Sequence, residues 1–172
     1  MAEPTAIQTE RLILEPAAER HRENLIAFLG DPAVMSVRKL GVLDTSAASQ
    51  VVNRMIAQWS SHGYGMFAVI ERDTGAFLGE CGLRAPEQGT IPELSYGLLT
   101  AARRKGYARE AATATVEHGF GPLGQPTLVA FARGDNAISR RLLESLGFEL
   151  VGERPKDGYT VVQYEARARG EG

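Results

Sequence analysis

A basic turn between a strand-like and a helix-like segment constrains this chain most. Between an extended segment at 93–99 and a helical segment at about 108–118 lies the run Arg103-Arg104-Lys105-Gly106-Tyr107-Ala108. The first amide groups of a helix have no partner inside the helix, and the helix dipole adds partial positive charge at the same end. A phosphate group satisfies both features, so this turn is a candidate anion-binding site.

The residue types in the turn suit an anionic ligand. Gly106 has no Cβ, so it can adopt a left-handed backbone angle and let a bulky anion approach the main chain. Arg103, Arg104 and Lys105 add charged donors, and guanidinium groups match phosphate geometry with paired hydrogen bonds. Most charge runs face solvent, so a solvated basic turn and a phosphate site both remain open from these residues alone.

Length and composition limit the classes of protein that fit. A chain of 172 residues predicts a single domain over 1–172, with a polar tail at 167–172 that frays. Nineteen Lys and Arg against 21 Asp and Glu give a net charge of -2, which argues against nucleic acid as a partner. A lone cysteine, Cys81, and three scattered histidines predict no disulfide and no metal site. Without a long apolar run, we expect a cytoplasmic protein with no membrane partner.

Hydrophobic patterning predicts a mixed α/β layer. Three antiparallel strands are expected side by side at the centre, and a closing antiparallel pair is expected to turn around 155–158. The extended segments are 11–15, 66–71, 76–83, 93–99, 127–132, 148–153 and 158–165, and the helical segments are 19–29, 46–61, 108–118 and 135–146.

The helix at 135–146 has clear signals at both ends. Asp135 or Asn136 is the expected N-cap, and Gly147 is placed for a left-handed C-terminal cap. Its apolar stripe is expected to be Ile138, Leu142 and Leu146.

Five segments carry a resemblance to a known family. They are Thr9-Glu10-Arg11-Leu12-Ile13-Leu14, the Gly79 to Leu83 strand, the Glu93 to Leu99 strand, the Arg103-x-x-Gly106-x-Ala108 turn, and Asn136-x-x-Ser139 leading to Leu146-Gly147-Phe148. In this order they resemble the GCN5-related N-acetyltransferase (GNAT) superfamily, and within it the ribosomal-protein N-terminal acetyltransferase (RimJ/RimL-type) branch. The resemblance covers essentially the whole chain. It implies the α/β (α+β) GNAT fold, with a mixed, mostly antiparallel sheet of about seven strands, about four flanking helices, and a splay between the fourth and fifth strands.

The resemblance also implies an activity. It indicates an acetyl-CoA-dependent N-acetyltransferase that moves the acetyl group directly to a primary amine, with no metal and no covalent enzyme intermediate. The acceptor is a protein N-terminus or a small-molecule amine. A larger acyl donor and a non-catalytic acyl-CoA sensor are alternatives, and monomer and homodimer both stay open. A dinucleotide-binding protein fits poorly, because no Gly-x-Gly-x-x-Gly follows an early strand.

Cofactor-binding positions follow from the resemblance residue by residue. The amides from about 104 to 109 would cradle the pyrophosphate of acetyl-CoA, and an amide near Leu98 would polarise the thioester carbonyl. The full set is Leu98, Leu99, Arg103, Arg104, Lys105, Gly106, Tyr107, Ala108, Arg109, Asn136 and Ser139. The chain departs from the family pattern at four positions, which are Ser95 for Gly, Gly97 for the common Trp, Arg104 for Gly and Arg109 for Thr.

Two residues are the catalytic candidates that the resemblance implies. Glu93 would take a proton from the acceptor ammonium through water, and Ser139 would give one to the leaving thiolate. Each has a plain alternative, because Glu93 can be a solvated carboxylate and Ser139 can bond the helix backbone. Asn136 is equally an N-cap or a contact to the pantetheine arm, and Glu80 is a second candidate base.

Overall fold

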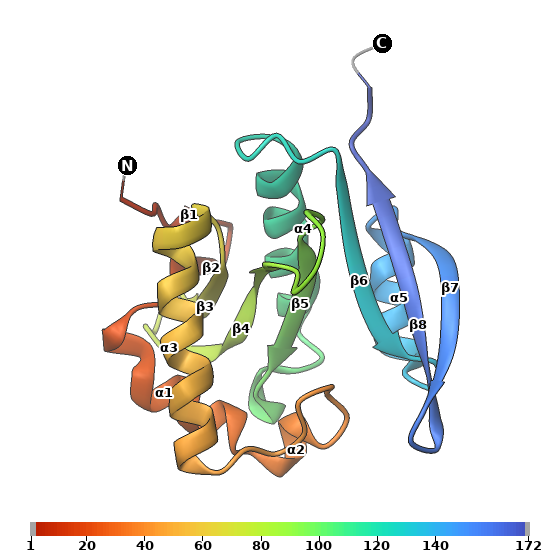
Figure 1. Ribbon diagram of the computed structural model, residues 1–172. Helices are drawn as coiled ribbons and strands as arrows, with labels where there is room; N and C mark the ends of the chain where they lie inside the picture. Colours follow the sequence, from red (N-terminus) through yellow and green to blue (C-terminus); the bar gives the residue numbers. More distant parts are fainter. Residues whose placement is uncertain (1–2, 171–172) are drawn as a thin grey trace.

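One open sheet runs through the computed structural model, which describes residues 3–170 (Figure 1). Within these residues the sheet has eight strands in the order β1-β2-β3-β4-β5-β6-β8-β7, and neighbouring strands are antiparallel except for β5 and β6. The strands are β1 Ile7–Gln8, β2 Leu12–Pro16, β3 Met66–Glu71, β4 Phe77–Arg84, β5 Glu93–Leu98, β6 Thr127–Arg133, β7 Glu149–Lys156 and β8 Tyr159–Arg167. The mixed, mostly antiparallel sheet is therefore confirmed. The strand beyond the expected seven is β1, which is two residues long.

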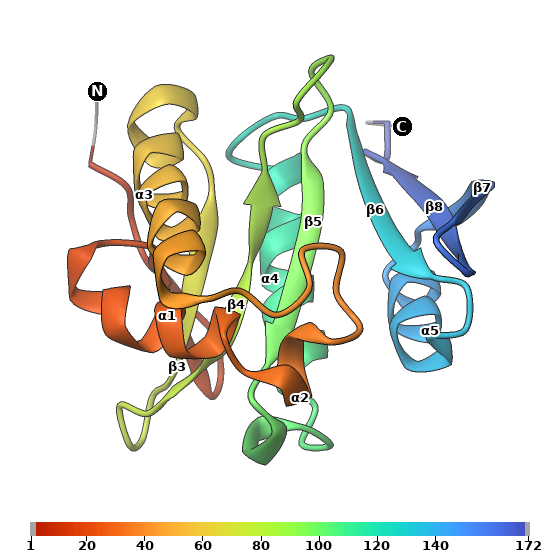
Figure 2. The ribbon, with the colours of Figure 1, turned by 60° about the horizontal axis from the view of Figure 1, so that its bottom comes forward.

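Helices cover both faces of the sheet (Figure 2). One face carries α1 Arg22–Leu29, α2 Pro32–Met35 and α3 Thr45–His62, and the other carries α4 Tyr107–Phe120 and α5 Ala137–Ser145. The short α2 was absent from the sequence prediction. Its start follows from Asp31, whose side chain accepts a hydrogen bond from the Ala33 amide, and from Pro32 in the first helical position.

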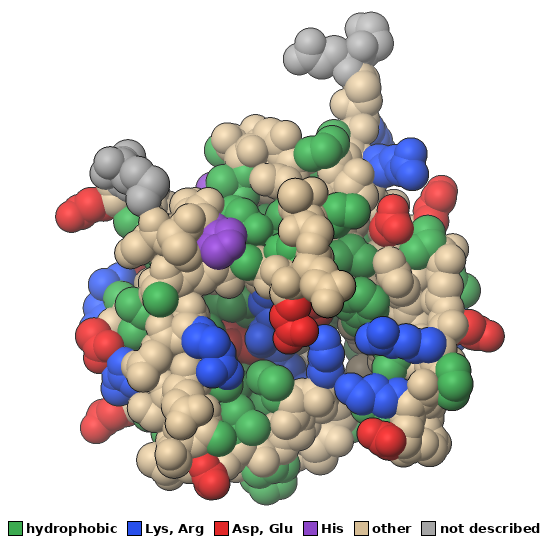
Figure 3. Space-filling model, in the orientation of Figure 1, with side chains coloured by type: hydrophobic (Ala, Val, Ile, Leu, Met, Phe, Trp, Pro, Cys, Tyr) green, Lys and Arg blue, Asp and Glu red, His purple; other side chains and the backbone are tan. Residues whose placement is uncertain are grey.

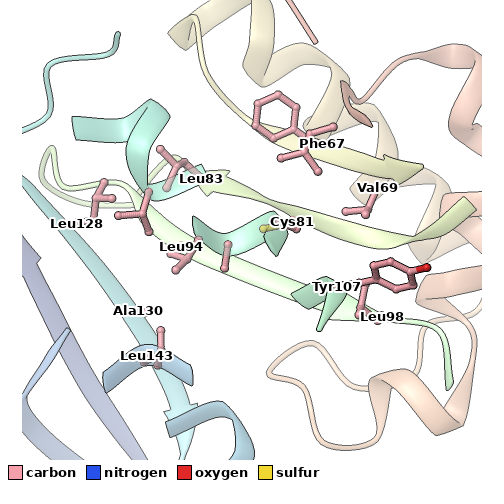
Figure 4. Close-up of a cluster of buried hydrophobic side chains, with 14 of the residues drawn as sticks. Phe67, Val69, Cys81, Leu83, Leu94, Leu98, Tyr107, Leu128, Ala130 and Leu143 are labelled. Carbon is pink, nitrogen blue, oxygen red and sulfur yellow. The ribbon is translucent and has the colours of Figure 1, made fainter. Parts of the chain in front are cut away.

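Two apolar clusters hold these layers together. The larger cluster lies between the sheet and α4, and Figure 4 shows Leu83, Leu94 and Leu98 gathered there beside Cys81. The second lies under α1, α2 and α3 and includes Phe28. Alternate residues of β4 and β5 therefore face different helical layers. Their side chains contribute to two opposite sides of the candidate site.

The sheet opens between β5 and β6. These parallel strands pair only at Glu93 with Val129 and at Leu94 with Ala130, and then they diverge (Figure 1). The splay expected between the strands at 93–99 and 127–132 is therefore confirmed.

Helix α5 is rotated relative to the prediction. Asn136 is its N-cap, and Gly147 follows it with a φ of 90°, as expected. The stripe was wrong in part: Ile138 is 77% exposed and Leu143 is the buried residue, whereas Leu146 is partly buried against the core as expected. Leu143 lies four residues after Ser139, and Ser139 bonds a sheet side chain, so this pair defines the inner face of the helix.

The closing hairpin is longer than predicted. Its turn is Asp157-Gly158, with φ angles of 43° and 89°, so Pro155 and Lys156 belong to β7. At the other end β8 extends to Arg167, the first residue of the tail expected to fray. Of that tail, residues 171–172 lie outside the described residues.

Gly82 is a position where the sheet has no room for a side chain. A Cβ on Gly82 would lie 2.5 Å from the Met66 Cα of the neighbouring strand. We expect Gly82→Ala to lower the free energy of unfolding by about 2 to 3 kcal/mol, because the strand backbones would have to separate. Urea unfolding measures this change.

Gly152 of β7 is the matched control, since nothing lies within 4 Å of its ideal Cβ position. Gly152→Ala should change the free energy of unfolding by no more than about 0.5 kcal/mol. Equal effects of the two substitutions would contradict the close β3–β4 approach.

Candidate functional site

The basic turn has the backbone geometry of an anion cradle. Gly106 caps α4 with a φ of 79°, and Arg104 also has a left-handed φ of 64°. The amide of Glu110 makes the first hydrogen bond of the helix, to the Gly106 carbonyl at 3.1 Å. The amides of residues 107–109 precede that bond and point out of the helix start. The left-handed angle expected of Gly106 is confirmed.

The four basic residues of this region have different roles. The Arg103 guanidinium is held by main-chain oxygens, with Nε 3.2 Å from the Leu98 carbonyl and Nη2 3.0 Å from that of Ala33. Arg103 therefore fixes the turn instead of projecting toward a ligand. Arg104, Lys105 and Arg109 are exposed. Gly106 and Arg109 also line a groove of about 790 Å³ between β1 and α4.

A charged network joins the turn to the N-terminal strand. Arg11 donates from Nη1 to the Lys105 carbonyl at 2.7 Å and from Nε to the Glu110 carboxylate at 2.9 Å, and its guanidinium lies 4.4 Å from the Tyr107 ring centre. Thr9 donates to the other Glu110 oxygen at 2.6 Å. Burial opposes ionisation of Glu110, but the hydrogen bonds from Thr9 and Arg11 outweigh it and lower its pKa.

Sequence reasoning missed this network. The Thr9-x-Arg11 pattern served only as a family signature, and Glu110 was not a candidate. The pair becomes visible only when β2 lies beside the start of α4, because the two residues are 99 positions apart.

The edge of β5 offers a free amide inside the splay. The Leu99 amide donates to the Leu78 carbonyl of β4 at 2.8 Å, so the Leu98 amide points the opposite way, toward the gap. Within the described residues, pairing with β6 ends at Leu94. Arg103 bonds the Leu98 carbonyl, whereas the Leu98 amide lies beyond the last residue pair with β6 and is available to a ligand.

A pair of hydroxyl groups bridges the splay on the α4 and α5 face. The Tyr96 hydroxyl of β5 lies 2.9 Å from Ser139 Oγ, in the first turn of α5. Asn136 accepts the Ser139 amide at 3.1 Å, so its role as N-cap is confirmed. Burial raises the pKa of Tyr96 to about 12, so both hydroxyls carry protons at neutral pH. The contact with Tyr96 was not foreseen.

The two candidate bases have very different surroundings on the opposite face. Glu80 is fully buried, and its Oε1 accepts from Arg38 at 2.8 Å and from Arg84 at 3.2 Å. Glu93 is half-buried, and among the described residues its carboxylate has no ion pair or side-chain hydrogen bond. The geometry therefore favours Glu93 as the carboxylate that a ligand can reach.

Arg38 explains the departure from the family pattern at residues 95 and 97. Its Nη1 lies 2.5 Å from the ideal Cβ position of Gly97, and its Nη2 donates to Ser95 Oγ at 3.2 Å. The guanidinium occupies the space that a larger side chain at 97 would fill. No sequence signal near Arg38 indicated this role.

Within residues 3–170 the fold brings together no group of three His, Cys, Asp or Glu side chains suited to a metal ion. None of the helices in this range is long and apolar enough to cross a membrane.

The comparisons with known proteins agree on one family. Residues 11–149 match the family described as "Acetyltransferase (GNAT) domain". The chain is 26% identical to an uncharacterized N-acetyltransferase of Bacillus subtilis, YoaA, over 85% of this chain and 84% of that protein.

Solved structures show the same fold. An acetyltransferase from Agrobacterium tumefaciens is 27% identical, with a TM-score of 0.80, and the match covers 95% of this chain and 94% of that one. RimL, a ribosomal L7/L12 N-terminal acetyltransferase solved with coenzyme A, is 17% identical, with a TM-score of 0.79, and covers 95% and 98% of the two chains.

Cys81 gives a test of how tightly α4 packs on the sheet. Its thiol is buried beside the Thr115 hydroxyl at 3.3 Å, and burial raises its pKa to about 12. We expect no reaction with a disulfide reagent such as DTNB at pH 8 in the folded protein, because the thiol stays protonated and the reagent cannot reach it. The same protein in urea should react with one equivalent. Stoichiometric reaction of the folded protein would show that the α4 layer opens readily.

Proposed function

The chain belongs to the acetyltransferase (GNAT) family, and we propose that it is an acetyl-CoA-dependent N-acetyltransferase of the RimJ/RimL-like branch. In this proposal one domain over 1–172 transfers the acetyl group directly to a primary amine. The observation that carries it is the β5–β6 splay, with the free Leu98 amide inside it and the turn at 103–108 at its end.

Acetyl-CoA binding follows from the start of α4 and the edge of β5. The pyrophosphate accepts from the amides around Gly106, and the exposed Arg104, Lys105 and Arg109 complement its charge. The pantetheine arm adds to the unpaired edge of β5 like another strand. RimL, which has the same fold, was solved with coenzyme A, and this supports the choice of donor.

The two faces of β5 divide the proton transfers. Glu93, on the face of α1 to α3, accepts a proton from the acceptor ammonium, directly or through water. The free amine then attacks the thioester carbonyl, and the Leu98 amide stabilises the negative oxygen that forms. When the carbon–sulfur bond breaks, the thiolate takes a proton from Ser139, whose hydroxyl is hydrogen-bonded to that of Tyr96. The nitrogen releases its second proton to water, and Ser139 recovers a proton from water.

Substitution of Glu93 and Ser139 tests this assignment. We expect Glu93→Gln to lower kcat about 100-fold or more near pH 7, since a positioned base contributes roughly that much. The defect should shrink above about pH 9, where an α-amino acceptor has lost its proton in solution. Ser139→Ala should lower kcat about tenfold to 100-fold at all pH values. Thiol release from acetyl-CoA is the measurement.

Glu87→Gln, in the exposed turn after β4, is the matched carboxylate control and should leave kcat unchanged. Binding of acetyl-CoA without thiol release across peptide, amino acid, polyamine and aminoglycoside acceptors would contradict an enzymatic role.

Gly106 tests the phosphate cradle. We expect Gly106→Ala to weaken acetyl-CoA binding about tenfold, because a side chain opposes the φ of 79° and its Cβ would lie 3.3 Å from Arg11 Nη2. Titration calorimetry measures the dissociation constant. Gly124→Ala is the control, since Gly124 also has a left-handed φ of 61° but lies beyond the other end of α4. Equal losses in both variants would argue against the cradle.

A further inference from the structure

The segment that links α2 to α3 lies across the open part of the splay. We call residues 36–43 the strap, and Figure 2 shows it crossing in front of β5. Arg38 reaches the β4–β5 side, where its Nη2 bonds Glu80 and Ser95. The next residue, Lys39, reaches the other side, with its Nζ 6.0 Å from the ring centre of Phe131 on β6. Two consecutive cations therefore contact the two walls of the opening.

A third cation approaches from the far wall. The guanidinium of Arg154, on β7, lies 5.9 Å from the centre of the same Phe131 ring. Lys39 and Arg154 are both exposed, and within residues 3–170 neither forms an ion pair. Figure 3 shows Lys and Arg side chains gathered over this part of the molecule.

The charges at the strap do not cancel. Glu80 is one carboxylate between two guanidinium groups, those of Arg38 and Arg84. Arg38 Nη1 is buried over Gly97 without a hydrogen-bond partner. With Lys39 and Arg154 added, positive charge exceeds negative charge where the strap crosses the splay.

The acidic side chains on this face of the sheet lie two residues along the strands from the cations at Phe131. Glu93 of β5, Glu165 of β8 and Glu149 of β7 are level with Val129 of β6, two residues before Phe131. Arg84 of β4 lies beside Glu93 while it bonds Glu80. Alternate residues along a strand are about 7 Å apart. Acidic side chains therefore exceed basic ones at the closed end of the splay, at Glu93, and cations exceed acids about 7 Å farther along β5, toward Leu98.

We propose that the amine acceptor carries an anionic group, which Lys39, Arg154 and Arg38 hold while its amine reaches the thioester near the Leu98 amide and passes its proton through water to Glu93. This inference rests on the proposed function and narrows its substrate class. The cations lie about three residues of β5 before Leu98, so an amine with a carboxylate roughly 5 to 10 Å away matches this spacing. Polyamines and aminoglycosides place a second cation against the strap, and like charges disfavour them.

Matched acceptor pairs test the proposal in a thiol-release assay. The small-molecule pair is 4-aminobutyrate and 1,4-diaminobutane, and the peptide pair begins Ser-Asp-Asp or Ser-Lys-Lys. In at least one pair the anionic member should have a kcat/KM about tenfold higher, and the advantage should fall as NaCl rises from about 20 mM to about 500 mM. The pair that responds identifies the source of the anionic group. Equal use of both members, or preference for the cationic members, would overturn the proposal.

Two exposed residues allow substitution without disturbing the core. Lys39→Gln and Arg154→Gln should each lower kcat/KM for the anionic acceptor about threefold to tenfold, through KM, and should not lower it for the cationic one. Arg54→Gln, on the exposed face of α3, is the charge-matched control and should leave the ratio of kcat/KM between the anionic and the cationic acceptor unchanged. If neither Lys39→Gln nor Arg154→Gln changed the ratio of kcat/KM between the anionic and the cationic acceptor, the proposal would also be overturned.

A binding measurement separates failure of this inference from failure of the enzymatic function. Glutarate should raise Tm by about 3 °C at saturating concentration, while 1,5-diaminopentane should not, and Arg154→Gln should remove the difference. If glutarate binds in this way but no acceptor releases thiol, the anion site stands and the proposed activity fails. Thiol release with no charge preference, and no glutarate shift, leaves the activity intact and refutes the anion site.

Discussion

The candidate site depends on the early end of the β5–β6 pairing. Because the two strands share only two residue pairs, the rest of the β5 edge lacks a neighbouring strand. Unpaired backbone groups are costly, and the chain satisfies part of the edge itself. Arg103 bonds the Leu98 carbonyl, while the Tyr96 side chain bridges the splay to Ser139. The Leu98 amide, which points into the splay, is the donor that the proposed reaction uses.

The geometry of the turn, in turn, depends on the N-terminal strand. Residues Thr9 and Arg11 hold Glu110 in the first turn of α4, and Arg11 also holds the Lys105 carbonyl. This leaves the amides at the helix start pointing outward in a fixed arrangement. A carboxylate in the first helical turn also suits the helix dipole. The phosphate cradle is therefore joined by direct hydrogen bonds to the link between β1 and β2, which holds Thr9 and Arg11.

Strand β5 separates the two chemical tasks because its alternate residues face different layers. Glu93 faces α1 to α3, while Tyr96 contacts α5 on the other side. In the proposed reaction the incoming amine and the leaving thiolate meet at one carbon but exchange protons with groups on different faces of β5. The strap adds a further division on the Glu93 side, since Arg38 and Lys39 contact opposite walls of the opening.

The sequence by itself determined what depends on neighbouring residues along the chain. The order of the longer elements, the left-handed Gly106, the Asn136 cap and the family pattern were predicted, because caps, glycine turns and hydrophobic periods act within a few residues. The face of α5 was predicted only in part, because Leu142 and Leu143 both allow an apolar stripe and only packing chooses between them. Tertiary structure alone decided the contacts that shape the site. The pairs Arg11–Glu110, Arg38–Glu80 and Tyr96–Ser139 are 99, 42 and 43 residues apart. Such pairs leave no periodic or local trace, because they form only after strand order and the splay bring their elements together.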